Sequence, residues 1–290
     1  MNKQRQRLYK WQCCLLLAGL SGLLGGCASG SATGTPQSRA AEQSPHSDET
    51  SLLAKTPPTY QAIFIESPPV IDGLLNDASW SLVPWTSLFV DIEGDKKPKP
   101  TFETRVKMAW DDTYFYIAAR LEEPHVWGSL TARDSIIYND NDFEVFIDPE
   151  SDATDYFEYE VNALNTPFDL MLTKPYVEGG TFNIDWDIIG LKTAVSVEGT
   201  VNDPSDEDQA WKVELAIPWS SLIGGQRAAI APHVDEIWRI NFSRVQWQHR
   251  IVDGAYQRIP DTPEHNWVWV PTGVIDMHRP RRWGFVQFVR

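Results

Sequence analysis

Short runs in which apolar and polar residues alternate constrain the fold of this chain more than any other feature. Side chains along a β-strand point alternately to its two faces, so such runs predict strands. They are rich in Val, Ile, Tyr, Phe and Trp, which favour strands. The clearest runs are TRVKMAW (104–110), YFYIAARL (114–121), DFEVFID (142–148), YFEYEVNA (156–163), AWKVELAI (210–217), IWRINFSRV (237–245) and WGFVQF (283–288). Helical periodicity is confined to PWSSL (218–222), a predicted short turn. We therefore predict an all-β chain, an antiparallel β-sandwich of two packed sheets with very little helix.

The first 26 residues have the features of a secretory signal. Four basic residues precede an apolar stretch, CCLLLAGLSGLL (13–24), that is too short for a comfortable membrane span. It ends in Leu24-Gly25-Gly26-Cys27, which resembles the lipobox of bacterial lipoproteins. The resemblance implies cleavage before Cys27 and acylation of Cys27. Because Ala28 follows rather than aspartate, it also implies lipid anchoring at the bacterial outer membrane. An ordinary secretory signal is the alternative.

Composition separates a tether from a folded domain. Residues 27–58 are rich in Ser, Thr, Ala, Gly, Pro and Gln, and such a segment buries too little apolar surface to fold, so we predict a flexible linker. Residues 59–290 are the predicted folded domain. The chain has three cysteines, Cys13, Cys14 and Cys27, so the body beyond Cys27 has no disulfides, thiolate metal sites or cysteine nucleophile.

The charge of the chain limits its partners. The formal net charge is −15, and the basic residues of the signal would not be part of the processed chain. A surface of this sign repels phosphate backbones, so nucleic acid is not expected as a partner. Neutral ligands and Ca²⁺ fit it better.

Carboxylates crowd the stretch DNDFEVFIDPESD (140–152) and the strand after it. Alternation places Phe143, Val145 and Ile147 toward the core, and Asp142, Glu144, Phe146 and Asp148 on the opposite face. Glu158, Glu160 and Asn162 share that face on the next strand, so Glu144 and Glu158 or Glu160 are expected to be neighbours. Like charges opposite one another destabilise a sheet unless solvent or a cation compensates. The cation is either Ca²⁺ or a protein side chain, for which the candidates are Arg105, Arg244 and Arg250.

The loop DPESDATD (148–155) between these strands is a candidate calcium site. Asp148, Glu150, Asp152 and Asp155 offer the hard oxygen ligands that Ca²⁺ prefers, although their spacing is not that of an EF-hand. A solvated acidic turn without metal is the alternative.

Several motifs in order give the chain a family resemblance. They are VIDGLLNDASW (70–80), WDDTYFYIAARLEEP (110–124), NDFEVFIDPESDATDYFEYEVNALNTPFD (141–169), WKVELAIPWSSL (211–222), WRINFSRVQW (238–247) and WVWVPTGVIDMHRPRRWGFVQF (267–288). Together they resemble the family 9 carbohydrate-binding modules, first known as domains attached to xylanases. The resemblance covers Tyr60 to the end of the chain. It implies a β-sandwich, bound calcium and recognition of sugar chain ends in support of polysaccharide breakdown, beside a neighbouring glycoside hydrolase.

The resemblance also implies a sugar-binding site. Tyr138 matches the stacking aromatic residue, Glu144 the strand glutamate that bonds sugar hydroxyls, and Asn162 the asparagine of the next strand. Glu160 stands where the xylanase modules have an arginine, and Met277 lies near the place of their second stacking tryptophan. Glu160 in place of a cation predicts a preference for neutral sugars over uronic acids.

Three other interpretations compete with sugar binding. Glu144 and Glu160 could act as the acid and base of a glycoside hydrolase, which needs two carboxylates about 5–10 Å apart. A related sandwich fold carries haem b in extracellular electron-transfer domains, and Met108, Met171, Lys174 and Met277 are available as axial ligands. A structural lipoprotein without a small ligand is the third. Trp127 and Trp247, near polar loops, are additional candidates for sugar stacking.

Overall fold

A computed structural model describes residues 56–222 and 230–290. They belong to the compact unit Ser51–Arg290. The predicted signal peptide, the lipidation site Cys27 and nearly all of the predicted linker lie outside the described residues.

Each of the predicted runs forms a strand. The seven strands that they form are β3 (Thr104–Trp110), β4 (Tyr114–Glu122), β5 (Asp142–Asp148), β6 (Tyr156–Asn162), β10 (Ala210–Pro218), β11 (Ile237–Gln246) and β15 (Gly284–Val289). The other strands are β1 (Thr59–Phe64), β2 (Val90–Asp91), β7 (Pro167–Leu172), β8 (Phe182–Asn183), β9 (Lys192–Glu198), β12 (His249–Val252), β13 (Ala255–Arg258) and β14 (His265–Val268).

Helical structure is short, as predicted. One α-helix, α3 (Ala78–Leu82), is described, and PWSSL contains the 3₁₀ turn η4 (Trp219–Ser221). The remaining 3₁₀ turns are η1 (Gly94–Lys96), η2 (Ile137–Asn139), η3 (Tyr176–Glu178) and η5 (Pro280–Arg282). Within the described ranges, no helix has the length and apolar character needed to cross a membrane.

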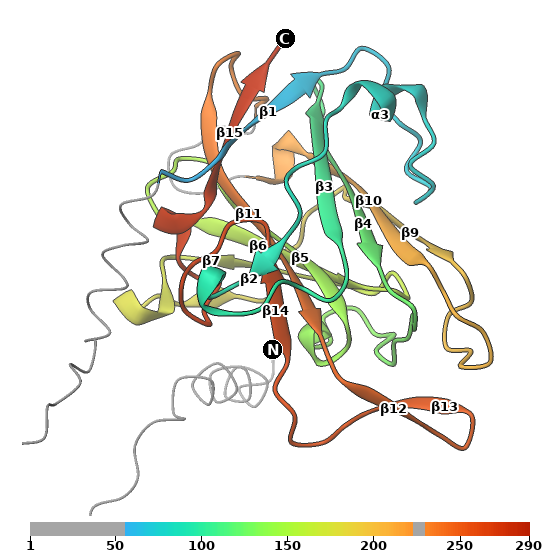
Figure 1. The fold of residues 1–290 in the computed structure, drawn as a ribbon. Helices are drawn as coiled ribbons and strands as arrows, with labels where there is room; N and C mark the ends of the chain where they lie inside the picture. The colour runs from blue at the N-terminus through green and yellow to red at the C-terminus, as the bar shows by residue number, and fades with distance from the viewer. Residues whose placement is uncertain (1–55, 223–229) are drawn as a thin grey trace, which may run out of the picture. The chain divides into compact units, whose positions relative to one another are not determined.

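The strands form one curled sheet with mixed strand directions. Its order is β8-β7-β6-β5-β11-β15-β1-β3-β4-β10-β9, with β14 paired to β11 and β2 paired to β14. Most pairs are antiparallel, but β1 runs parallel to both of its neighbours, β15 and β3 (Figure 1). The prediction of an all-β fold is therefore correct, whereas a purely antiparallel arrangement is not, because the first strand inserts between the last strand and β3.

The core lies between the two halves of this sheet. Phe143 and Val145 of β5 belong to the same buried cluster as Met108 of β3 and Val213 of β10. The sheet therefore curls so that its β5–β6–β11 half and its β3–β4–β10 half enclose one core. The strands β12 and β13 pair only with each other and project as a hairpin (Figure 1).

Candidate functional site

Four carboxylates share one face of β5 and β6. In the antiparallel register, Glu144 lies opposite Glu160, and Asp142 lies opposite Asn162. Glu158 is two residues from Glu160 and so points to the same side. The pairing of Glu144 with Glu160 confirms the neighbours predicted from alternation. We call Asp142, Glu144, Glu158 and Glu160 the carboxylate cluster.

The carboxylate cluster is buried rather than solvated. The exposed fractions are 0% for Asp142, 6% for Glu144, 4% for Glu158 and 1% for Glu160. One end of this face is covered by a remote segment, because the rings of His278 and Trp283 pack against Phe146 and Tyr156. Solvent therefore does not compensate the repulsion between these side chains.

The hydrogen bonds of the carboxylate cluster are incomplete. The backbone N–H of Val245 donates to Asp142 Oδ1 at 3.1 Å, and that of Tyr138 donates to Glu160 Oε2 at 3.2 Å. Asp142 Oδ2 and Glu158 Oε2 are buried and have no hydrogen-bond partner among the described residues. Burial raises the pKa of all four carboxyl groups, and that of Glu144 to about 7. Neighbouring carboxylates raise the pKa of Asp142, Glu158 and Glu160 further.

The three arginines considered as compensating cations lie elsewhere. Arg244 is itself buried and pairs with Glu123 at 2.9 Å. Arg105 stacks on the ring of Trp85, and Arg250 is exposed on β12. Among the described residues, no Lys or Arg forms an ion pair with the carboxylate cluster.

Aromatic side chains lie beside the carboxylate cluster. Trp127 and Trp247 are buried together with Val245, and Tyr138 and Tyr256 pack on them. The indole of Trp247 donates to the carbonyl of Tyr138 at 2.8 Å, and the Arg258 guanidinium covers the Trp247 ring. Tyr138 is partly exposed as a residue, whereas Trp127 and Trp247 are buried, and the Tyr138 hydroxyl oxygen is itself enclosed.

Asn162 and Met277 are placed differently from Tyr138. Asn162 is fully buried: its Nδ2 donates to Leu130 O and Asp140 Oδ2, and its Oδ1 accepts from the backbone N–H groups of Leu164 and Thr166. Met277 is also buried, and its carbonyl accepts from the Trp283 indole. In this conformation both residues support the surrounding loops, and their contact with a sugar stays a prediction.

The carboxylates of the predicted calcium loop differ in their surroundings. Asp148 is fully buried and accepts from the Ala153 N–H, Asp152 caps Thr154, and Glu150 is exposed. Asp148 Oδ1 is buried and has no hydrogen-bond partner among the described residues, which is a feature expected of an oxygen that coordinates a metal. However, among those residues the groups with three ligand atoms within 4.8 Å do not include the loop. Calcium binding by Asp148, Glu150, Asp152 and Asp155 stays a prediction.

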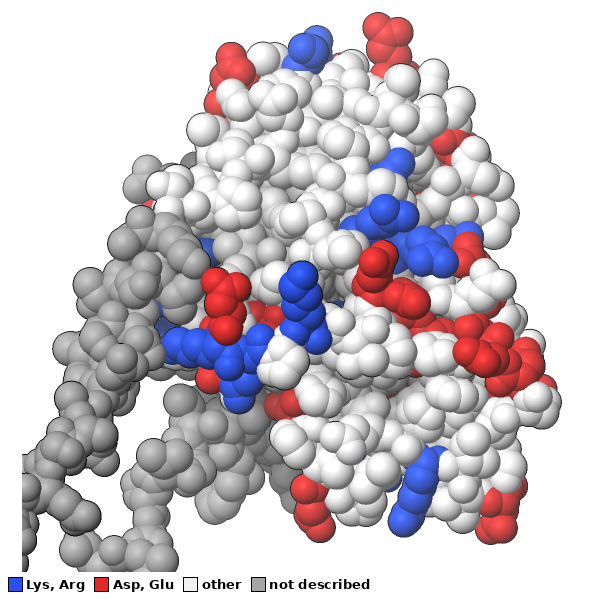
Figure 2. Space-filling model, viewed as in Figure 1, with Lys and Arg blue, Asp and Glu red and all other residues white. Residues whose placement is uncertain are grey.

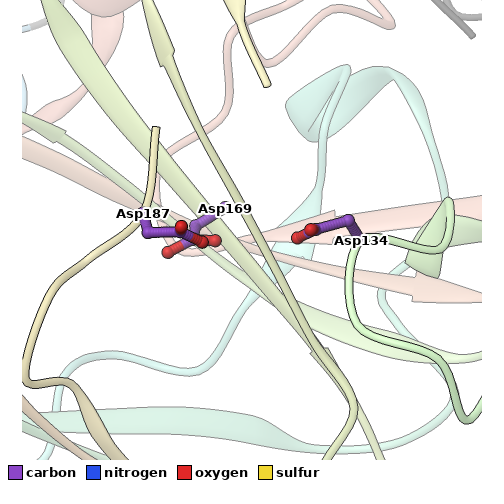
Figure 3. Close-up of side chains that lie close together, drawn as sticks. All are labelled: Asp134, Asp169 and Asp187. Carbon is purple, nitrogen blue, oxygen red and sulfur yellow. The ribbon is translucent and has the colours of Figure 1, made fainter. Parts of the chain in front are cut away.

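A second acidic group already has a protein cation. Asp134, Asp169 and Asp187 lie close together, with Asp169 and Asp187 side by side and Asp134 opposite them (Figure 3). The Arg133 guanidinium contacts both Asp169 and Asp187 at 2.5 Å. Arg133 therefore offsets part of this negative charge, whereas no ion pair is formed by the described residues with the carboxylate cluster.

The family of the chain follows from a comparison with family models. The model described as carbohydrate family 9 binding domain-like matches residues 71–235, a range that contains β3 to β10 and the whole carboxylate cluster. The chain belongs to this family. The membership confirms the resemblance seen in the sequence and the prediction of a carbohydrate-binding domain.

Two curated relatives of this family 9 binding domain carry enzyme names. The chain is 28% identical to Exoglucanase XynX of Acetivibrio thermocellus over 165 residues, which is 57% of this chain and 13% of that protein. It is 29% identical to Endo-1,4-beta-xylanase A of Thermoanaerobacterium saccharolyticum over 171 residues, 59% of this chain and 12% of that protein. The chain thus matches only about an eighth of either relative.

Solved structures share the fold. A putative carbohydrate-binding protein from Bacteroides uniformis superposes with a TM-score of 0.59 at 16% identity, covering 80% of this chain and all of that chain. A family 9 module from Caldicellulosiruptor kristjanssonii, solved in complex with glucose, gives a TM-score of 0.50 at 18% identity, covering 79% and 96%. At these identities the likeness concerns the fold.

The family and the geometry also bear on the competing interpretations. Membership in a binding family favours the binding interpretation over the haem alternative, and Met108, one of the considered haem ligands, is a core residue. Asp142, Glu158 and Ser243 were not predicted as site residues from the sequence. Alternation placed the first two on the correct face, but the position of Ser243 opposite Glu144 depends on the β5–β11 register, which no local pattern reveals.

Proposed function

We propose that this chain is a non-catalytic protein that binds neutral poly- or oligosaccharides at the surface next to Tyr138 and Glu144. The observation that carries the proposal is the position of a partly exposed tyrosine beside a row of carboxylates. Tyr138 is partly exposed and its backbone is fixed to Glu160, while Glu144 is the most exposed member of the carboxylate cluster. An aromatic ring covers the C–H face of a sugar, and a carboxylate accepts from its hydroxyls.

The chemistry of this surface selects against acidic sugars. A uronic acid would bring a further carboxylate toward Glu144 and Glu160, where no basic side chain of the described residues forms an ion pair. Neutral sugars offer hydroxyl donors without that repulsion. The site therefore accepts hydroxyl-rich neutral chains, including the chain ends at which only one sugar ring is engaged.

Hydrolysis is not part of the proposal. The matching family model is described as a binding domain, and the match covers the segment that holds Glu144 and Glu160. The enzyme names of the two relatives belong to proteins that are about eight times longer than the matched segment. We propose that this chain holds a polysaccharide while a separate glycoside hydrolase, such as a xylanase, degrades it, and that acylation of Cys27 anchors it at the outer membrane.

A glycan array probed with the full chain tests this proposal. We expect binding to neutral glucan or xylan oligosaccharides and little binding to uronic acid polymers. Binding to no neutral glycan, or a preference for acidic ones, would contradict it.

A further inference from the structure

Two histidines and a tyrosine from separate parts of the chain meet beside the hairpin β12–β13. His125 lies in the loop after β4, whereas His249 and Tyr256 belong to β12 and β13. The ring centroids are 4.9 Å apart for His125 and His249, 5.7 Å for His125 and Tyr256, and 5.2 Å for His249 and Tyr256. The Tyr256 hydroxyl oxygen lies 3.1 Å from His125 Nδ1. We call these three residues the histidine–tyrosine cluster.

The spacing within the histidine–tyrosine cluster is that of side chains around one metal ion. Zinc bonds to nitrogen and oxygen at about 2.0–2.2 Å, so two ligand atoms of one ion lie about 3.0–3.5 Å apart, and two coordinated imidazoles have ring centres about 5 Å apart. The distances from Tyr256 to His125 Nδ1 and between the two imidazoles agree with these values. A hydrogen bond between Tyr256 and His125 has the same length, but it gives no reason for His249 to close the group from a third side.

The backbone fixes these side chains from two directions. The N–H of His125 donates to Oε1 of buried Glu123 at 3.1 Å, which holds the loop after β4. His249 pairs with Arg258 in the hairpin, and Tyr256 is two residues from Arg258, so His249 and Tyr256 stand on the same face. The three side chains are therefore positioned by two separate elements that face each other.

The hairpin has more need of a fastening than the other strands. β12 and β13 pair only with each other, and an isolated two-stranded hairpin is marginally stable in water. Its contacts with the rest of the chain include that of Tyr256 with His125 and that of Arg258 with the Trp247 ring. An ion bound by both the hairpin and the loop after β4 would close the chain between them and so limit the open states of the hairpin.

The surroundings of Tyr256 favour a cation. Burial raises the pKa of the Tyr256 phenol, and the carboxylates of Asp208, Asp206 and Asp203 raise it further, which shows that negative charge lies nearby. On the face shown in Figure 2, acidic and basic side chains are interspersed. Surface charge on that face does not by itself select one place for an ion, so specific ligands are needed.

We propose that His125, His249 and Tyr256 hold one transition-metal ion, Zn²⁺ or Cu²⁺, which fastens the hairpin β12–β13 to the loop after β4. Imidazole suits zinc and copper, whereas calcium and magnesium take oxygen ligands. Three protein ligands leave a fourth position for water, and all three residues are partly exposed. The ion takes the place of the proton shared by the Tyr256 hydroxyl and His125 Nδ1, and that proton leaves to solvent.

This site is independent of sugar binding and of calcium. It shares no residue with the surface formed by Tyr138 and Glu144 or with the loop 148–155, and β12 and β13 lie beyond the residues 71–235 that the family model matches. Within the described residues, the groups of three His, Cys, Asp or Glu side chains with ligand atoms within 4.8 Å include no histidine. The third ligand here is a phenol oxygen.

Zinc titration calorimetry tests the proposal on the full chain in detergent, without a histidine tag and after treatment with a chelator. We expect one zinc site that is at least about tenfold weaker in His249→Phe and in Tyr256→Phe, because each variant loses a ligand. His265→Phe is the matched control and should bind as the parent does, since His265 is exposed and stacks on Trp267. If His249→Phe does not fold, His249→Gln provides the same comparison. Calcium and magnesium at the same concentration should not displace the zinc.

Two further measurements locate the ion. Cu²⁺ should give the parent a visible charge-transfer band from the coordinated phenolate, and Tyr256→Phe should lack this band. Zinc at a hundred times its dissociation constant should slow hydrogen exchange of the hairpin amides by up to about a hundredfold, while exchange in β6 stays unchanged.

The proposal is overturned if the parent binds no zinc, or if His249→Phe or Tyr256→Phe binds zinc as tightly as the parent. It is also overturned if His265→Phe weakens binding as much as they do, or if calcium displaces the zinc. Unchanged hydrogen exchange of the hairpin in the presence of zinc would likewise overturn it, because the ion would then be bound elsewhere.

Discussion

His278 shows how enclosure changes the chemistry of a single residue. Although the residue keeps some solvent exposure, its imidazole is surrounded by the rings of Phe146, Tyr156 and Tyr176, and Nδ1 lies 3.1 Å from the Tyr156 hydroxyl. This burial lowers the pKa of His278 to about 4, despite the nearby Asp276 carboxylate. The imidazole is therefore neutral in the native state at pH values where it is charged in the unfolded chain.

The stability of the protein should consequently fall in acid through this residue. Below pH 6.5 the unfolded chain takes up a proton that native His278 does not accept until about pH 4, so stability is lost as pH falls across this window. The contribution is up to about 1.4 kcal/mol per pH unit. Denaturant unfolding of the parent and of His278→Phe between pH 4 and 7 measures this contribution as the change with pH in the difference between their stabilities. The loss of the Tyr156 hydrogen bond lowers the stability of the variant by the same amount at every pH, so it does not affect that change. Parallel pH profiles would show that His278 does not titrate in this way.

At the scale of elements, one buried carboxylate joins α3 and the segment before it to the sheet. Glu214 of β10 accepts from the Gly73 N–H at 2.7 Å and from the Trp80 indole at 2.6 Å. Gly73 has φ +82°, and a Cβ there would lie 2.8 Å from the backbone nitrogen of Ser196 in β9. The glycine is thus needed both for its left-handed backbone and for the close approach of the chain to β9.

Gly73→Ala should therefore destabilise the protein by about 2–4 kcal/mol, from backbone strain and steric overlap together. Gly254→Ala is the matched control, because Gly254 has φ +74° but nothing lies within 4 Å of its Cβ position. It should cost only the strain, about 1–2 kcal/mol. Chemical denaturation compares the two variants, and equal losses would show that close packing against β9 is unimportant.

The strands show what the sequence could and could not predict. β3 and β5 have the predicted bounds, because both contain strong alternation between turn residues. The parallel insertion of β1 was not predictable, since it joins strands at opposite ends of the chain. Alternation likewise placed Glu144 and Glu160 on one face, but it could not reveal that His278 and Trp283, more than a hundred residues away, cover Phe146 on that face.

At the scale of the whole molecule, the membrane anchor is predicted independently of the folded domain. The lipobox-like Leu24-Gly25-Gly26-Cys27 predicts that Cys27 is acylated. Cys27→Ala should then release the chain from the membrane fraction or block its processing, as cell fractionation and metabolic labelling with a fatty acid would show. A variant that stays acylated and membrane-bound would contradict the anchor at Cys27.

The central claim is that sugar is held at the surface formed by Tyr138 and Glu144, and one comparison tests it most directly. Calorimetric titration with the neutral oligosaccharide that binds best measures the affinity of the parent, of Tyr138→Ala and of Tyr114→Ala. Tyr114 is also a partly exposed tyrosine, but it lies on β4 in the other half of the sheet. We expect Tyr138→Ala to bind at least about tenfold more weakly, because one stacked ring and its buried area are lost, with little change in melting temperature. Tyr114→Ala should bind as the parent does. Unchanged affinity in Tyr138→Ala would contradict the account.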